Sequence, residues 1–164
     1  MSGINFNDTD SKAVAGIFAQ WNNGTDESTN LNTATYTAAP IFTQEAYGNY
    51  SSEFTKNSNT EIQVNFDGIV LFWANLGMQS AGTRVCISAR THKNGSTVGP
   101  RSSVTYIRNS GSGDSESSAI ISPFYMPVVD GDTIDIRTIN LANATDTTTF
   151  YGTNQNYVTI LRVA

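Results

Sequence analysis

Three stretches of the chain are apolar at nearly every position, whereas a strand half exposed to water alternates apolar and polar residues. These stretches are Ile69 to Met78, Ile120 to Val129 and Tyr157 to Val163. Both alternating sets of side chains are apolar in each, so both faces of each strand require a burial partner. In the first stretch the β-branched and aromatic residues favour a strand, and a buried helix is the alternative.

The second stretch opens a predicted turn-linked pair, Ile120 to Leu141, folded about Asp130-Gly131-Asp132. Its second arm carries Asp135 and Arg137 among apolar residues, which is typical of a strand with one face in water. We therefore expect the first arm to lie in an inner sheet and the second arm in an outer sheet. The acidic turn would join these two environments.

Shorter alternating segments predict further strands. Residues 61–66 alternate, and Asp67-Gly68 predicts a hairpin that joins them to the apolar stretch that follows. Residues 83–90 alternate as a half-exposed strand, with residues 101–108 as the predicted partner.

The N-terminal third has weaker signals. Residues 13–21 fit a buried strand better than a short helix, and residues 33–44 are expected to be extended with an edge or bend at Pro40. In total, about ten strands with turn-rich connections predict an all-β sandwich or jelly roll.

The length of 164 residues and the 38% hydrophobic content fit a single domain that buries its own core. Residues 1–12 are polar and show no periodicity, so they are expected to form a flexible tail or an arm that orders on a partner. Residues 13–164 would form one jelly-roll domain.

Charge and cysteine content exclude several classes of protein. The net charge is -5 and the few basic residues are scattered along the chain, which opposes binding to a nucleic-acid backbone. We see neither a basic start followed by an apolar segment nor a run of about 18 apolar residues, so we expect no signal peptide and no membrane insertion. The single cysteine, Cys86, is expected to pack as a small side chain.

The three apolar stretches also predict association. If they lie in one sheet, its outer face is a contiguous apolar patch larger than the few hundred Å² that a soluble monomer exposes. Burial of such a patch at about 25 cal/mol per Å² would contribute several kcal/mol per subunit. The pattern therefore predicts a homo-oligomer.

The order of these elements resembles the jelly roll of the tumour necrosis factor and complement globular-head superfamily. The resemblance is carried by FDGIVLFWANL, by YMPVVDGDTIDI with its Gly-Asp turn, and by the closing NYVTILRV. The usual aromatic-rich ending with a glycine before the last strand is matched only in part, by Phe150-Tyr151-Gly152. A viral jelly roll outside this superfamily and an immunoglobulin-like sandwich are the alternatives.

The resemblance implies a two-sheet, trimeric jelly roll in which the three apolar strands form the inner sheet around a threefold axis. It leaves open which face of each strand meets the sister subunits. The residues expected at the subunit interface are Val70, Phe72, Ile121, Tyr125, Tyr157 and Leu161.

The sequence contains no recognisable catalytic or metal-binding constellation. The only histidine, His92, is interpreted as a solvated turn residue, and Asp130 and Asp132 as turn residues in preference to calcium ligands. The carboxylate pairs Asp8/Asp10 and Asp114/Glu116 lie in polar segments with no rigid framework. We therefore predict a protein that is not an enzyme, with no catalytic residue, no cofactor and no metal.

Aromatic residues near the loops have two possible roles, since they could stack on sugars at a tip or pack beneath long loops. Packing is the preferred interpretation. The residues concerned are Trp21, Tyr47, Tyr50, Phe54, Phe150 and Tyr151.

Two functional hypotheses follow from these features. The first is a non-enzymatic structural protein of a tailed phage, namely a homotrimeric capsid decoration or head/tail knob protein located in the virion and bound to other capsid or tail proteins. The alternative is the receptor- or glycan-binding tip of a phage tail fibre or bacterial adhesin, with a host-surface glycan as its partner. Both rest on analogy of fold and on a Ser/Thr/Asn-rich composition of low charge.

Overall fold

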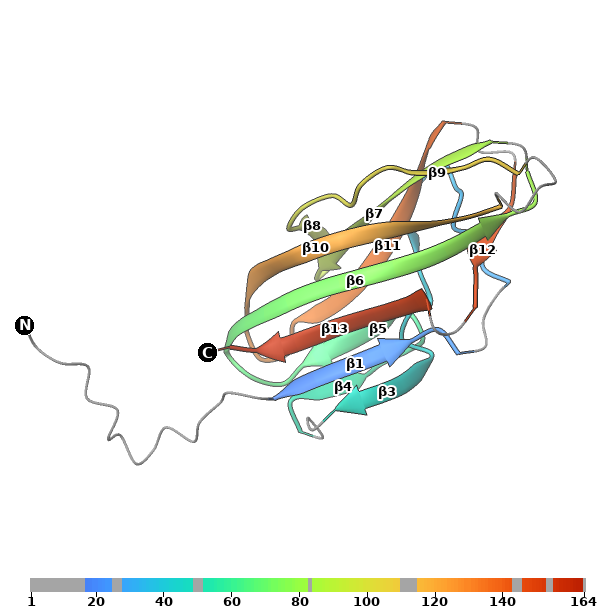
Figure 1. The fold of residues 1–164 in the computed structure, drawn as a ribbon. Coiled ribbons are helices and arrows are strands. Elements are labelled where there is room, and N and C mark those ends of the chain that lie inside the picture. The colour runs from blue at the N-terminus through green and yellow to red at the C-terminus, as the bar shows by residue number, and fades with distance from the viewer. Residues whose placement is uncertain are drawn as a thin grey trace, which may run out of the picture.

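The computed structural model describes residues 17–24, 28–48, 52–82, 84–109, 115–142, 146–152 and 155–163. Within these ranges the chain forms thirteen strands in two antiparallel sheets, which lie face to face as the two layers of a sandwich (Figure 1). The predicted all-β, two-sheet architecture is confirmed, with short additional strands beyond the expected ten or so.

The first sheet has the order β10-β6-β13-β1-β3, and β12 also pairs with β6. Its strands are β1 (Phe18–Asn22), β3 (Gln44–Gly48), β6 (Gly68–Ser80), β10 (Glu116–Val128), β12 (Thr148–Phe150) and β13 (Asn156–Arg162). The strands β10, β6 and β13 contain the three stretches that are apolar on both faces, and they lie side by side in this sheet.

The second sheet has the order β4-β5-β11-β7-β8, with β2 paired to β11 and β9 paired to β7. Its strands are β2 (Thr37–Ala38), β4 (Phe54–Lys56), β5 (Glu61–Val64), β7 (Val85–Lys93), β8 (Ser96–Val98), β9 (Thr105–Ile107) and β11 (Thr133–Ala142). The predicted strand at 83–90 is confirmed as β7, in which Val85, Ile87 and Ala89 are fully buried.

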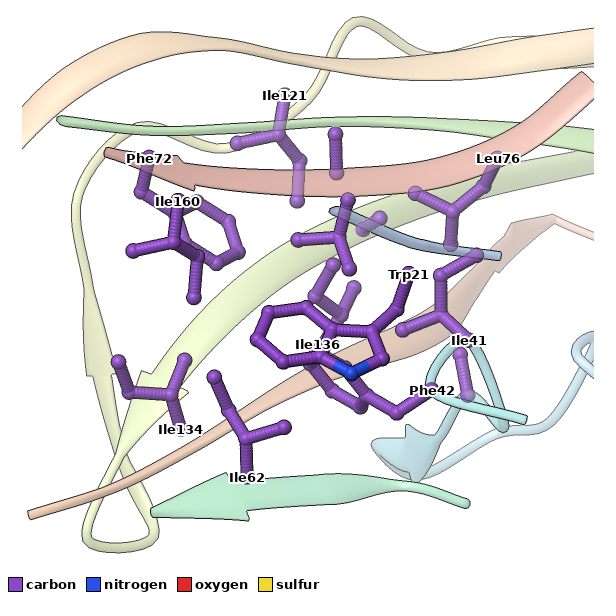
Figure 2. Packing of buried hydrophobic residues seen from close by; sticks show 14 of the residues in the cluster. Trp21, Ile41, Phe42, Ile62, Phe72, Leu76, Ile121, Ile134, Ile136 and Ile160 are labelled. Atoms are coloured by element: carbon purple, nitrogen blue, oxygen red, sulfur yellow. The ribbon is translucent and has the colours of Figure 1, made fainter. Parts of the chain in front are cut away.

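The core lies between the sheets and is centred on Trp21 of β1. Its indole meets Phe42 and Phe54 edge to face, with ring centroids 5.6 and 6.0 Å apart. Figure 2 shows Ile62 and Ile134 of the second sheet across from Phe72 and Ile160 of the first. Burial of Trp21, Phe54 and Phe150 agrees with the packing role expected for these aromatic residues.

Two tight turns carry the chain from one sheet to the other. The Asp130-Gly131-Asp132 turn joins β10 of the first sheet to β11 of the second, as expected from the polar residues of the second arm. The Asp67-Gly68 turn does the same between β5 and β6, so the predicted hairpin of these two strands is wrong. β5 pairs with β4 and β11, whereas β6 pairs with β10 and β13. The turn between them leads from the second sheet to the first instead of folding back within one sheet.

At the N-terminal end, the strand expected in residues 13–21 is confirmed where the structure describes it, as β1. The predicted arm at residues 1–12, Tyr50 and Asp114 lie outside the described residues.

A β-bulge interrupts β10 between Ile121 and Phe124. Ile121 pairs with Ala74, but Phe124 pairs with Phe72, so β10 has one residue more than β6 over this interval. A bulge of this kind reverses which alternate side chains face the core. Accordingly Ala119 and Ile121 are buried before the bulge, and Met126 and Val128 after it.

Candidate functional site

The first sheet presents an apolar surface on the side away from the core. One row of this surface crosses four strands, because Tyr125 pairs with Leu71, Leu71 with Leu161, and Leu161 with Phe18. Tyr125 is 69% exposed, although it lies within the edge strand β10 and not in a loop. We call this surface the apolar outer face and define it by Phe18, Ile69, Leu71, Trp73, Tyr125 and Leu161.

Alternation along β6 produces this face. Val70, Phe72, Ala74 and Leu76 point into the core and are buried, so the intervening Ile69, Leu71 and Trp73 point outward. An outward strand face of a water-soluble sandwich is normally polar.

Three of the six residues predicted for a subunit interface lie elsewhere. Val70, Phe72 and Ile121 have no exposed surface, and Figure 2 shows Phe72 and Ile121 among the core side chains. Their assignment to the interface is wrong because their side chains pack between the two sheets of a single chain. Ile121 and Tyr125, which simple alternation places together, face opposite ways because of the bulge in β10.

The other three predicted residues, Tyr125, Tyr157 and Leu161, lie on the outward side of the sheet, and their contact with a sister subunit stays a prediction. The residues predicted for the subunit interface did not include Ile69, Leu71 and Trp73 of β6. Their apolar pattern was visible in the sequence, but the pattern did not say which of the two apolar sets faced the core.

The outward side changes character toward the far end of β6. Here Asn75 and Gln79 replace the apolar side chains, and Gln79 is flanked by Glu116 of β10 and Thr149 of β12. Asn75 donates a hydrogen bond from its side chain to the Gln155 carbonyl, at 2.5 Å.

A polar recess of about 370 Å³ lies at this end of the sheet. Its lining residues all carry a hydroxyl or an amide, apart from Ala81, and none carries a charge. They are Gln79, Ser80, Ala81, Asn109, Ser115, Thr147 and Thr149. We call this feature the polar recess.

His92 lies in β7 and is only 4% exposed, so its interpretation as a solvated turn residue is wrong. The second sheet brings it between Asp135 on β11 and Thr97 on β8, in one cross-strand row. The ring of Tyr36 covers it edge to face, with centroids 5.1 Å apart. Burial lowers the pKa of His92, opposed by the nearby Asp135 carboxylate.

The arrangement resembles a hydroxyl–imidazole–carboxylate series but is not set up for proton transfer. Thr97 Oγ1 and His92 Nε2 are joined by a hydrogen bond of 3.2 Å, whereas His92 Nδ1 lies 3.7 Å from Asp135 Oδ1 and has no hydrogen-bond partner. A relay requires hydrogen bonds of about 2.6–3.2 Å at both nitrogens. Arg137 donates hydrogen bonds to both oxygens of Asp135, at 2.7 to 3.1 Å, so the charge of this carboxylate is already balanced by the guanidinium.

The acidic turn after β10 is closed by protein groups. Asp132 is 4% exposed and accepts hydrogen bonds from Lys93 Nζ (2.9 Å), Asn94 Nδ2 (2.6 Å) and the Val129 amide (3.0 Å). Three of the roughly four lone-pair sites of this carboxylate are therefore taken by protein donors. This geometry supports the structural interpretation of the turn.

Metal-binding clusters and membrane-spanning helices are both absent from the described ranges. No three His, Cys, Asp or Glu side chains gather closely enough there to hold a metal ion. The same part of the chain has no helix with the length and apolarity needed to span a bilayer.

Comparison with solved structures identifies the fold. The structure of Eiger TNF from S. frugiperda superimposes with a TM-score of 0.61 over 92% of this chain and 94% of that chain, at 15% sequence identity. The chain has a TNF-like jelly-roll fold. Murine APRIL superimposes on the same fold with a TM-score of 0.57, covering 90% of this chain and 98% of that one at 9% identity.

At these identities the TNF-like likeness describes the fold and does not assign a function. Neither a protein-family model nor a curated protein sequence matches the chain. Two features of the described residues bear on function, namely the apolar outer face and the polar recess.

Proposed function

We propose that the protein is a non-enzymatic assembly module that forms a homotrimer through its apolar outer face. The observation that carries this proposal is the outward-facing apolar row Tyr125–Leu71–Leu161–Phe18, which crosses four adjacent strands of one sheet. The TNF-like fold supports a threefold arrangement, because the corresponding sheet of that superfamily packs around the threefold axis.

The chemistry of the face supports association over exposure. Full burial of a large apolar side chain contributes about 1.5–3 kcal/mol, and association costs about 4–15 kcal/mol in lost translational and rotational freedom. A single exposed aromatic residue would not overcome that cost. The six residues of the apolar outer face, repeated on each subunit, would each add part of such a contribution, and together they favour association.

Light scattering coupled to size exclusion tests the trimer. We expect a mass of about 53 kDa, three times the 17.7 kDa of one chain, at micromolar concentration. Tyr125→Asp places a charge on the most exposed residue of the face, and we expect this variant to elute as a folded monomer.

Tyr106→Asp is the matched control. Tyr106 is also an exposed strand tyrosine, 49% accessible, but it lies on β9 in the other sheet. The assignment of the face is refuted if the wild-type protein is monomeric at micromolar concentration, or if Tyr106→Asp dissociates the assembly and Tyr125→Asp does not.

The proposed setting of this trimer is the virion of a tailed phage, as a capsid decoration or head/tail knob protein in contact with other capsid or tail proteins. The low charged content of 14% and the single cysteine support a structural role of this kind. Gene neighbourhood tests it, since a position beside capsid genes favours decoration and a position beside tail genes favours a knob. A gene outside any phage region would contradict the virion assignment while leaving the trimer intact.

A second candidate function is recognition of a receptor or host-surface glycan at the tip of a fibre or adhesin. One observation favours it. The polar recess is a concave site lined by neutral hydrogen-bonding groups, at the end of the sheet opposite to the apolar row.

A further inference from the structure

The polar recess has the features of a preformed site for a small polar ligand. We propose that it binds a neutral saccharide, through the side chains of Gln79, Ser115, Thr147 and Thr149. This inference rests on the second candidate function and does not depend on trimer formation, because one chain supplies every residue of the recess.

Hydrogen bonds within the chain fix the walls of the recess. Asn109 Nδ2 donates to the carbonyls of Ser80 (3.1 Å) and Ala81 (3.3 Å), and the Ser80 amide donates to the Ser115 carbonyl (3.0 Å). Ser80 Oγ donates to the Thr147 carbonyl at 3.3 Å. These bonds join the end of β6 to the segments before β10 and β12, so a ligand meets a site that is already shaped.

Other polar groups of the recess are left for a ligand. Among the described residues, the side chains of Gln79, Ser115, Thr147 and Thr149 have no hydrogen-bond partner. A glutamine amide both donates and accepts, and so does each hydroxyl. Sugar hydroxyls have the same dual character, so each of them could be satisfied here without an ionic group.

The charge around the recess selects against ionic ligands. Among the described residues, the lining has no Lys or Arg to neutralise a phosphate or carboxylate. The nearest acid by strand register is Glu116, which pairs with Gln79 across the sheet and would repel an anion.

The size of the recess limits the ligand. Its volume of about 370 Å³ is near the lower end of the roughly 300–1,000 Å³ range of small-molecule sites. This favours one or two sugar rings over a longer oligosaccharide.

NMR titration of the full chain tests the inference. The probes are glucose, galactose, mannose, N-acetylglucosamine and lactose, with sialic acid as a charged comparison. We expect at least one neutral sugar to bind with a Kd of about 1 mM or tighter and to shift the amides of Gln79 and Thr149. Sialic acid should bind at least tenfold more weakly.

Substitutions localise the binding. Gln79→Ala and Thr149→Val remove the ligand-facing groups, and we expect each to weaken binding about tenfold or more. Thr97→Val, a hydroxyl-to-methyl change on β8 of the other sheet, should leave the affinity unchanged. The inference is overturned if no neutral sugar binds the wild-type protein, or if Gln79→Ala and Thr149→Val bind it as tightly as Thr97→Val does.

The same samples separate this inference from the trimer. A trimer mass without sugar binding refutes the saccharide site and leaves the assembly proposal standing. Sugar binding by a monomeric wild-type protein refutes the trimer and supports the site.

Discussion

At the scale of single residues, His92 is the side chain with the most unusual surroundings. It is the only histidine of the chain and is buried between two strands, beneath the ring of Tyr36. Burial is the main cause of its lowered pKa; the nearby Asp135 raises that pKa, while Arg137 and Arg90 lower it. His92 is therefore held neutral in the folded protein at a pH where an exposed histidine takes up a proton.

This burial predicts a pH-dependent stability. Below the ordinary histidine pKa of 6.5 the unfolded chain binds a proton that folded His92 resists, so the free energy of unfolding should fall as the pH drops. The loss should continue until the pH reaches the lowered pKa of the folded state. Urea unfolding between about pH 7.5 and pH 5.5 measures it, because few other groups titrate in that range.

His92→Gln provides the comparison, since glutamine keeps a polar partner for Thr97 and does not titrate. We expect the stability of this variant to change less over the same pH range. Parallel curves for the two proteins would mean that His92 is not the source of the pH dependence.

At the scale of elements, Asp132 ties the crossover between β10 and β11 to the turn between β7 and β8. Its carboxylate binds Lys93 and Asn94 in that turn as well as the Val129 amide. Asn94 in turn accepts a hydrogen bond from the Thr133 amide, at 2.8 Å. One carboxylate thus holds together the ends of four strands.

Asp132→Ala should therefore destabilise the protein by about 1–3 kcal/mol at pH 7, because it removes three hydrogen bonds, one of them from the charged Lys93 Nζ. Urea unfolding measures the change. Asp130→Ala is the control, since Asp130 is exposed and donates a hydrogen bond from its backbone amide, which alanine keeps. Equal stabilities for the two variants would contradict the role of Asp132.

The hydrogen bonds of Asp132 also make the stability of the protein depend on pH. Burial raises this pKa, but the Val129 amide, Lys93 and Asn94 together lower it below the usual 3.8. The stabilisation is therefore complete above the unfolded value and is lost as the pH falls toward the lowered one. This window lies well below that of His92.

At the scale of elements, the sequence predicted the location of the main strands correctly but not the way in which each strand faces the core. Apolar content on both faces located β6, β10 and β13, and the resemblance to the superfamily placed them in one sheet, which the structure confirms. It did not reveal the bulge after Ile121, although Pro123 lies within the bulge and a proline inside a strand indicates an edge or a bulge. The prediction therefore placed Ile121 and Tyr125 on one face.

The two Asp-Gly turns show a second limit. A turn between two strands fits a hairpin and a crossover between sheets equally well at the level of local residues. The polar residues Asp135 and Arg137 marked the strand after one turn as belonging to the other sheet. Glu61 and Gln63 likewise distinguished β5 from the doubly apolar β6, but the turn residues were interpreted as a hairpin, so the pairing was predicted incorrectly. His92 was misplaced because Tyr36, whose ring covers it, is distant in the sequence.

At the scale of the whole molecule, the outward side of the first sheet is divided into two regions. The apolar outer face occupies the end near the C-terminus, where Figure 1 also shows β1 beginning, and the polar recess lies at the opposite end of β6. An interface formed by the first region would leave the second accessible. Assembly and ligand binding are therefore compatible within one sheet.

The composition of the apolar outer face also predicts how the assembly responds to salt. None of its six residues is charged, so burial of apolar surface would hold the subunits together, and salt does not weaken that contribution. Surface charge pairs, in contrast, are screened at about 1 M salt, where the Debye length is about 3 Å. We expect the trimer mass at about 1 µM protein to be the same in about 50 mM and about 1 M NaCl, measured by light scattering. Dissociation to the 17.7 kDa monomer at high salt would show that charged groups, and not this face, hold the assembly together.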